Sequence, residues 1–543
     1  MNKFRILAVT AAVAALLSTV SIVGAVAASA PVHQPVTLGA SSINWQACDA
    51  ASGLQGVPGA QCALVPVPLD YAHPSGAKIK LAISRIKHTV PQSQFQGVML
   101  VNPGGPGGSG LILSILGQFV PNGAGSYYDW IGFDPRGVGA SQPALSCDPE
   151  YFSFDRPSYI PVQASTLQTW LARSRGYDAA CAANNGPILQ HLTTIDAAKD
   201  MDSIRKALGA TQINYYGFSY GTYLGQVYST LFPNRVRREV LDSNVDPRKV
   251  WYPANLDQDV AFERNINIWF GWLAKHDDVY HLGATQNAVK TLFYRTEAKL
   301  TFHPADGKIG GDEWVDVFLY AGYYQQTWLD LGSLFSNFIH NGDVTDLENA
   351  YLSDNAFGDD NGFAVYNGVQ CTDIQWPQAW STWSRDNWAT FNRAPFETWA
   401  NAWYNAPCLH WPAPAHATAP FTVNGSHVAS ALLIDETLDA ATPYPGSLEV
   451  RKLFPNSSLI ALPGGTSHAN SLSGDACEDD QIAAYLADGT LPPRVAGDGP
   501  DTSCAPLPEP DPGAAARPSV AASALARAER AMQALRLRVA ARG

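Results

Sequence analysis

Short hydrophobic runs alternate with loops and helical patterns along much of the chain. Each run has the length of a strand, and several lead directly into a loop rich in glycine or proline. The expected strands are Val98–Val101, Trp130–Phe133, Ile213–Tyr216, Arg238–Asp242, Ala431–Ile434 and Ser458–Ala461. Strands separated by helical patterns predict an α/β protein with a mostly parallel sheet and crossover helices.

Two further patterns extend this sheet. The segment Thr194–Leu208 has apolar residues at helical spacing and stops before Gly209, a common helix terminator. Upstream, Cys62–Leu69 and Lys78–Ile86 are strand-like and are split by Pro74–Gly76. They predict a hairpin that opens the sheet.

A long block of different composition separates the strands Arg238–Asp242 and Ala431–Ile434. It holds twelve of the fifteen tryptophans, from Trp251 to Trp411, among helical patterns and polar loops. The expected strands of the sheet stop before this block and continue after it, which predicts a helical cap inserted at residues 246–428. Most of these tryptophans are expected to pack a core of the cap itself, and a few could line a substrate cavity.

The first thirty residues have the pattern of a secretory signal. Lys3 and Arg5 precede the apolar run Ile6–Val26, and Ala28–Ala30 offers a small-x-small cleavage site. A retained membrane anchor is the alternative, because the run approaches the length of a span. Polar residues interrupt the run and no second span follows, so we expect cleavage, secretion and no stable membrane insertion.

The C-terminal residues 506–543 change character again. Pro506–Pro512 is a polar, proline-rich linker, and Ala514–Gly543 is rich in alanine and arginine with apolar residues at helical steps. The tail is therefore either an amphipathic surface anchor, a partner helix or a dispensable end.

Composition limits the domain count and the partners. A chain of 543 residues with 46% hydrophobic and 15% charged residues fits one large globular domain with an insertion. We assign residues 31–245 and 429–505 to the two parts of that domain, and we expect a monomer. The net charge of −13 disfavours nucleic acid as a partner, because phosphates repel an acidic surface.

The eight cysteines predict disulfides in an exported chain. We expect sequential pairing, because short loops bring their ends together most easily. The pairs would be Cys48 with Cys62, Cys147 with Cys181, Cys371 with Cys408, and Cys477 with Cys504. A metal site is the weaker alternative, since no C-x₂-C or H-x₃-H spacing occurs near them, and we expect no metal and no other cofactor.

The segment Gly217–Gly221, Gly-Phe-Ser-Tyr-Gly, follows an expected strand and precedes a helical pattern. This is the context of a nucleophile elbow, in which a sharp turn exposes the serine hydroxyl. Ser219 is therefore the candidate nucleophile. The upstream loop Asn102–Gly110 is a candidate oxyanion loop, with Gly105 preferred over Gly104 and with the Tyr220 amide as the second donor.

A serine nucleophile needs a base and a carboxylate that orients it. In α/β proteins with such a nucleophile elbow, the order along the chain is serine, acid, histidine. Asp439 and His468 each follow a late strand, so both should reach the carboxyl edge of the sheet near Ser219. Asp435, Glu436 and Asp242 are the less favoured alternatives for the acid.

Taken together, these motifs resemble the secreted bacterial tripeptidyl aminopeptidases, relatives of prolyl aminopeptidase within the α/β-hydrolases. The resemblance covers roughly residues 42–505. It rests on Asn102–Gly110, Asp134–Gly139, Gly217–Gly221, Asp439–Pro443, Ser467 with His468, and the cap segments Trp251–Glu263, Tyr280–Gly283 and Cys371–Asp373. It implies an α/β-hydrolase fold with a cap, and release of tripeptides from the free N-termini of peptides or proteins.

A free N-terminal ammonium requires a carboxylate in a shielded pocket. The candidates in the cap are Asp257, Asp259, Glu263 and Asp373. An esterase or lipase with the same triad is the alternative, because this scaffold carries many chemistries. A non-enzymatic binding protein is disfavoured by the complete set of Ser219, Asp439 and His468.

Overall fold

The computed structural model describes residues 36–41, 43–354 and 357–513. The expected signal segment and the tail at residues 514–543 lie outside these ranges. Within them, no helix combines the length and the hydropathy needed to cross a bilayer.

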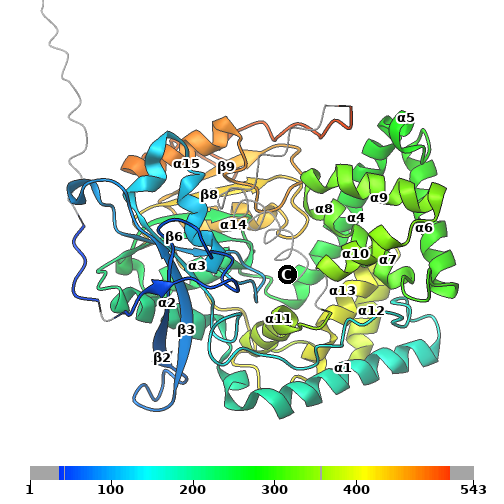
Figure 1. Cartoon of the computed structure of the whole chain (residues 1–543), viewed down its shortest axis with the longest axis horizontal. Helices are drawn as coiled ribbons and strands as arrows, with labels where there is room; N and C mark the ends of the chain where they lie inside the picture. Colours follow the sequence, from blue (N-terminus) through cyan, green and yellow to red (C-terminus); the bar gives the residue numbers. More distant parts are fainter. Residues whose placement is uncertain (1–35, 42, 355–356, 514–543) are drawn as a thin grey trace, which may run out of the picture. The chain divides into compact units, whose positions relative to one another are not determined.

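One sheet of ten strands forms the core of the described part of the chain (Figure 1). Its order is β1-β2-β3-β5-β4-β6-β7-β8-β9-β10, antiparallel as far as β5 and parallel from β5 onward. The strands are β1 Gln46–Ala47, β2 Gln61–Pro68, β3 Lys78–Ile86, β4 Val98–Asn102, β5 Asp129–Phe133, β6 Ile213–Phe218, β7 Val236–Asp242, β8 Ala431–Glu436, β9 Ser457–Leu462 and β10 Thr502–Ser503. The predicted parallel sheet and its opening hairpin are confirmed.

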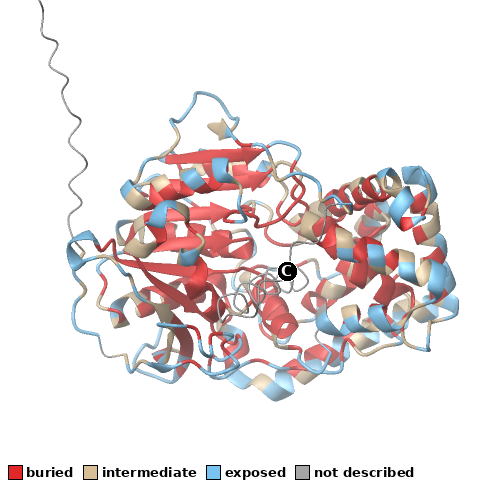
Figure 2. Ribbon diagram, turned by 45° about the horizontal axis from the view of Figure 1, so that its top comes forward, coloured by how far each residue is buried: buried red, intermediate tan, exposed pale blue. Residues whose placement is uncertain are grey.

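The inner strands are buried along nearly their whole length because both faces of the sheet are covered (Figure 2). In β4, Val98 and Leu100 join the core that packs under α2 (Thr194–Ala207) and α3 (Tyr220–Leu231). Met99 and Val101 face the other way. They pack with η2 (Leu111–Gln118) and α15 (Ala476–Asp488). Helix α14 (Pro445–Leu453) joins the first face through Val450.

A helical cap interrupts the sheet between β7 and β8, as the sequence predicts. Its described helices are α4 Tyr252–Lys275, α5 Asp277–Tyr280, α6 Gln286–Phe302, α7 Gly311–Phe318, α8 Tyr320–Tyr323, α9 Trp328–Asn341, α10 Thr345–Asp354, α11 Asn361–Asp373, α12 Trp380–Phe391 and α13 Thr398–Asn405. Trp269, Trp272, Trp314 and Trp328 are buried together in a core of the cap. Most of the tryptophans here thus serve packing, as expected.

The cap also recruits a helix from an earlier part of the chain. Helix α1 (Ala164–Asn185) lies next to α12 and α13 (Figure 1), and its Trp170 stacks on Trp403 with ring centroids 5.5 Å apart. The sequence pattern assigned this segment to the sheet domain. Its low amphipathicity gives no sign of a partner, because the partner lies more than two hundred residues away.

Other boundaries differ from the sequence expectation. Strand β8 extends to Glu436, so Asp435 and Glu436 belong to the buried strand rather than to the loop. The two-residue strand β10 continues the sheet beyond β9. The expected linker Pro506–Pro512 packs on the cap instead of hanging free: Trp272 Nε1 donates to Pro510 O at 3.0 Å.

The structure joins all eight cysteines in sequential order. The disulfides are Cys48–Cys62, Cys147–Cys181, Cys371–Cys408 and Cys477–Cys504. Each closes a loop of between 14 and 37 residues within one local region. The Cys147–Cys181 bond joins the loop after β5 to α1, the helix that packs on α12 and α13.

Candidate active site

Ser219 occupies a strained turn between β6 and α3. Its backbone has φ 56° and ψ −128°, outside the regions that L-residues usually adopt. A Cβ at Gly217 would lie 2.6 Å from the Gly221 carbonyl oxygen, and one at Gly221 would lie 2.7 Å from the Asn102 carbonyl oxygen. The two glycines therefore permit the close approach that the turn needs. Ser219 is 8% exposed and lines the cavity described below.

His468 and Asp439 form a buried pair. His468 Nδ1 lies 2.7 Å from Asp439 Oδ2, and both residues are at most 1% exposed. The Asp439 carboxylate also accepts bonds from the amides of Ala441 and Thr442 at 2.8 and 3.0 Å, which fix its orientation. Arg264 on α4 donates to the Asp439 carbonyl at 3.2 Å, so the cap helps to hold this loop.

Ser219 lies at the same edge of the sheet as this pair. Its amide donates to the Asp242 carbonyl at 3.1 Å, and the amide of Ala469 donates to Ser243 Oγ at 2.8 Å. The segment after β7 thus connects the serine turn to the histidine loop. Tyr323 lines the Ser219 cavity, and its ring centroid lies 5.8 Å from that of His468. Among the bonds of the described residues, none directly joins the Ser219 hydroxyl to the imidazole.

The three other acidic candidates are buried nearby but bond other groups. Asp242, Asp435 and Glu436 accept hydrogen bonds from Ser471, Ser447 and Ser467 respectively. Burial raises the pKa of all three carboxyls, that of Glu436 to about 8. Asp242 and Glu436 therefore hold the segment that carries His468, whereas Asp435 bonds the first turn of α14.

The glycine-rich loop after β4 lies against the serine turn. At Gly104, which has φ +98°, a Cβ would lie 2.6 Å from the Phe218 carbonyl oxygen. The Gly104 amide donates to Asn102 Oδ1 at 3.0 Å, so this amide is already engaged. The amides of Gly105 and Tyr220 make no hydrogen bond to any described residue, and both residues line the cavity with Ser219. That pair is suited to receive an oxyanion.

A cavity of about 450 Å³ opens on Ser219 between the sheet edge and the cap. Its volume lies in the range of sites that bind small ligands or short peptides. Trp251, Asn255 and Asp257 line it from the start of α4, and Tyr323 and Gln370 line it from α8 and α11. Among the tryptophans that the structure describes, Trp251 is the one that lines this cavity.

The four candidate amine ligands occupy different places. Asp257 lines the cavity and forms an ion pair with Lys249. Asp259 lies behind the wall, where it accepts a bond from Asn401 at 2.8 Å and where burial raises its pKa to about 8. Glu263 is engaged with Lys290 at 2.7 Å. Neither Asp259 nor Glu263 belongs to the described cavity wall.

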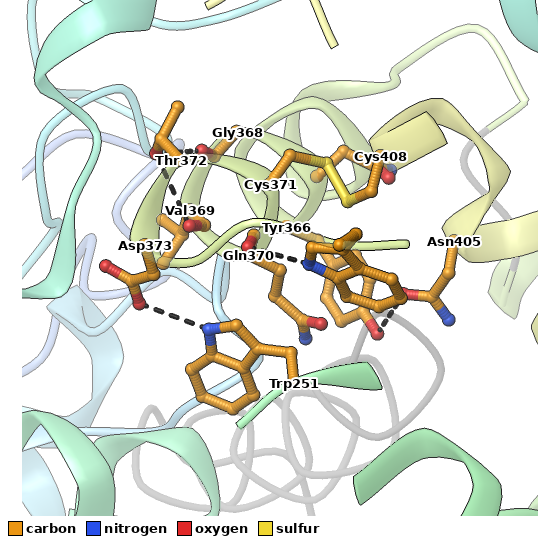
Figure 3. Close-up of a disulfide and its surroundings, with 12 residues drawn as sticks. Trp251, Tyr366, Gly368, Val369, Gln370, Cys371, Thr372, Asp373, Asn405 and Cys408 are labelled. Atoms are coloured by element: carbon orange, nitrogen blue, oxygen red, sulfur yellow. Dashed lines mark hydrogen bonds between the residues drawn. A yellow bond between two sulfur atoms is a disulfide. The ribbon is translucent and has the colours of Figure 1, made fainter. Parts of the chain in front are cut away.

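Asp373, the fourth candidate, supports the cavity from outside. It accepts bonds from the Thr194 amide and hydroxyl, both at 2.6 Å, and from Trp251 Nε1 at 3.2 Å. Figure 3 shows Asp373 and Gln370 projecting from the end of α11 toward Trp251, next to the Cys371–Cys408 disulfide. Burial raises the pKa of Asp373 to about 6.

The sequence argument missed several residues of the site. Asn102, Trp251 and Arg264 all contact the site, but the sequence argument assigned none of them a role of its own. Asn102 is the first residue of the glycine-rich loop, and that position was a usable signal. No local pattern distinguishes Arg264 from other polar residues of cap helices.

Comparison with known protein families agrees with this geometry. Residues 97–336 match a model described as the alpha/beta hydrolase fold. Residues 394–504 match a model described as TAP-like protein. The expected α/β-hydrolase fold is confirmed.

Several curated proteins are similar over nearly the whole chain. A tripeptidyl aminopeptidase of Streptomyces lividans is 41% identical over 87% of this chain and 88% of its own. A serine protease, Hip1, of Mycobacterium tuberculosis is 30% identical over 91% of this chain and 97% of its own. A carboxylesterase B of the same organism is also 30% identical, over 83% of this chain and 88% of its own.

Proposed function

This chain belongs to the tripeptidyl aminopeptidase family of α/β-hydrolases, and we propose on that basis that it is a serine exopeptidase releasing tripeptides from free N-termini. The similarity to a tripeptidyl aminopeptidase extends across the sheet domain and the cap. The observation that carries the proposal is the buried His468–Asp439 pair, which shares a sheet edge with the Ser219 turn.

In the proposed mechanism Ser219 Oγ attacks the carbonyl carbon of the third peptide bond. His468 Nε2 takes the hydroxyl proton, while Asp439 orients the imidazole and stabilises its cation. The amides of Gly105 and Tyr220 donate to the oxyanion, and each such donor contributes about 3 kcal/mol of barrier reduction. The imidazolium then protonates the leaving amine. Water hydrolyses the acyl-enzyme through the same base and releases the tripeptide.

The cap explains why the enzyme would act on peptide ends. Its helices wall the cavity that opens on Ser219, so a chain must enter by its end rather than lie across the site. We assign the N-terminal ammonium to Asp257, because it is the candidate carboxylate that lines the cavity. The ammonium of the substrate would replace that of Lys249, which pairs with Asp257 in the structure.

Hydrolysis of chromogenic amides tests the proposal. The enzyme should cleave a tripeptidyl amide with a free N-terminus much faster than dipeptidyl, tetrapeptidyl or N-acetylated amides, and Ser219→Ala should abolish this activity. Equal cleavage of the N-acetylated amide would contradict the exopeptidase. Activity retained by the Ser219→Ala variant would contradict the mechanism.

An esterase is the second candidate function, favoured by the similarity to a carboxylesterase B. The same triad would hydrolyse an ester with an alcohol as leaving group. A comparison of short acyl esters with tripeptidyl amides separates the two. A higher kcat/KM for the esters would identify the esterase.

The protein has features of an exported enzyme, with four disulfides and a signal-like N-terminal sequence. We propose that the mature chain works outside the cell as a monomer on peptide or protein N-termini. Cell fractionation and the N-terminal sequence of the mature protein test the location. Light scattering tests the oligomeric state.

A further inference from the structure

The positive and negative charges on the wall of the Ser219 cavity do not cancel. Five charged residues line this wall: Asp246, Lys249, Asp257, Arg264 and Arg393. Both carboxylates already hold a cation. Asp246 pairs with Arg248 at 2.7 Å, and Asp257 pairs with Lys249. The two arginines form no ion pair with any described carboxylate. The charge left over on the wall is therefore positive.

The side chains of Arg264 and Arg393 differ in their contacts. The Arg264 guanidinium donates to Asn265 Oδ1 at 2.9 Å and to the carbonyls of the Asp439 loop, so it is fixed in place. Arg393 lies in the turn between α12 and α13, where its amide donates to Thr390 O at 3.0 Å. Its side chain is exposed and makes no hydrogen bond to any residue that the structure describes. Arg393 thus presents a free guanidinium at the rim of the cavity.

A carboxyl behind the wall does not neutralise Arg393. The Arg393 cation acts to lower the pKa of Asp259, but burial has the larger effect and raises that pKa to about 8. At neutral pH the Asp259 carboxyl is therefore mostly protonated and uncharged. It is held by Asn401 at 2.8 Å rather than by an arginine.

We infer that Arg393 determines specificity by binding an acidic side chain within the tripeptide that the enzyme releases. This inference rests on the proposed function and adds a substrate class to it. A guanidinium binds a carboxylate through two parallel hydrogen bonds, a geometry that an ammonium cannot match. A lysine or arginine at the same substrate position would meet a like charge.

The test uses alanine-based tripeptidyl amides in which each position in turn carries Glu, Gln or Lys. At one position, kcat/KM should be about tenfold higher for Glu than for Gln, the effect of one charge-assisted hydrogen bond. Arg393→Gln should remove this preference, and its Tm should match that of wild type because the Arg393 side chain is exposed. Arg393→Glu should reverse it in favour of Lys. Arg385→Gln, which alters an exposed arginine paired with Asp386 on α12, is the matched control and should change nothing.

The other source of a substrate carboxylate is the C-terminus of a short peptide. Tetrapeptides with free and amidated C-termini separate this from a side chain. The inference would be overturned if the preference followed the free C-terminus of the peptide. It would also be overturned if wild type and Arg393→Gln each cleaved the Glu and Gln substrates at equal rates. Failure to cleave any tripeptidyl amide would instead refute the proposed function. A circular dichroism spectrum and a Tm equal to those of wild type show that each variant is folded.

Discussion

Asp373 accepts a hydrogen bond at 3.2 Å from the indole nitrogen of Trp251, and so holds one wall of the Ser219 cavity from behind. Trp251 faces the cavity, whereas Asp373 lies behind the wall, where it also bonds Thr194 at the start of α2. One carboxylate therefore connects the cap to the sheet domain. Asp373 thus positions Trp251, and its expected role as an amine ligand stays a prediction.

Replacing Asp373 by Asn should weaken this wall. One amide oxygen cannot accept the bonds that both carboxylate oxygens now accept from Thr194 and Trp251. We expect a loss of about 1–3 kcal/mol in the free energy of unfolding, measured in urea. KM should rise more than kcat falls. If the variant instead lost its preference for free over acetylated N-termini, Asp373 would be the amine ligand.

Asp439→Asn should lower kcat by about 10⁴-fold, because the amide no longer selects the productive imidazole tautomer. Glu436→Gln is the matched control. Glu436 is buried beside the same loop but bonds the Ser467 amide rather than His468. Steady-state kinetics should show a loss below tenfold for the control. Similar losses in both variants would mean that loop packing, not imidazole orientation, controls activity.

Asn102→Ala should impair the oxyanion loop. Asn102 Oδ1 accepts the Gly104 amide at 3.0 Å and keeps the loop against the serine turn. Without it we expect kcat to fall by about 10- to 100-fold, less than or comparable to the loss of one oxyanion donor. KM for the tripeptidyl amide should change little. An unchanged kcat would show that the glycines alone fix the loop.

Stability should decrease as pH rises toward 8. Asp178 on α1 is buried, neither of its oxygens has a hydrogen-bond partner among the described residues, and burial raises its pKa from 3.8 to about 8. The folded protein thus keeps a proton that the unfolded chain releases above pH 4. The contribution of Asp178 to the free energy of unfolding should fall by about 1.4 kcal/mol per pH unit in this window.

The variant Asp178→Asn tests this directly. It cannot titrate, so its gain in Tm over wild type should be larger at pH 8 than at pH 5. Thermal unfolding at both pH values gives the comparison. An equal change in Tm at the two pH values would contradict a raised pKa for Asp178.

The segment after Cys504 should stabilise the cap. In Figure 1 it runs, orange to red, from the sheet domain toward the cap, where Pro510 O accepts the Trp272 bond and Glu509 pairs with Lys275 at 2.9 Å. A chain that ends at Ala505 should have a lower Tm than one that ends at Gly513, because the Trp272 indole loses this cover. Lys275→Ala should change Tm little, since an exposed ion pair contributes about 0–1 kcal/mol. Equal Tm values for the two truncated chains would contradict the role of the segment.

The sequence predicts those parts of the fold that depend on local pattern. The strand and helix on either side of Ser219 each carry their own apolar periodicity, and Gly217 and Gly221 mark the turn between them. Disulfide order was predictable for the same reason. Loop closure favours near neighbours in the chain.

The surroundings of a side chain depend on residues that are distant in the sequence, and local patterns could not predict them. Asp257 and Asp259 are two positions apart on one helix, yet one lines the cavity and the other is buried behind it. Helical spacing shows that they point in different directions but not which direction faces the cavity. Likewise, the sequence places Trp170 in the sheet domain, and only the structure shows that it stacks on Trp403 of the cap.

The order of the four disulfides has a consequence for biosynthesis. Each bond joins two cysteines with no other cysteine between them. A chain made from its N-terminus therefore presents each correct partner before the next competing thiol emerges. Oxidation can follow the direction of synthesis, and no wrongly paired bond has to be broken before the cap and sheet close around Ser219.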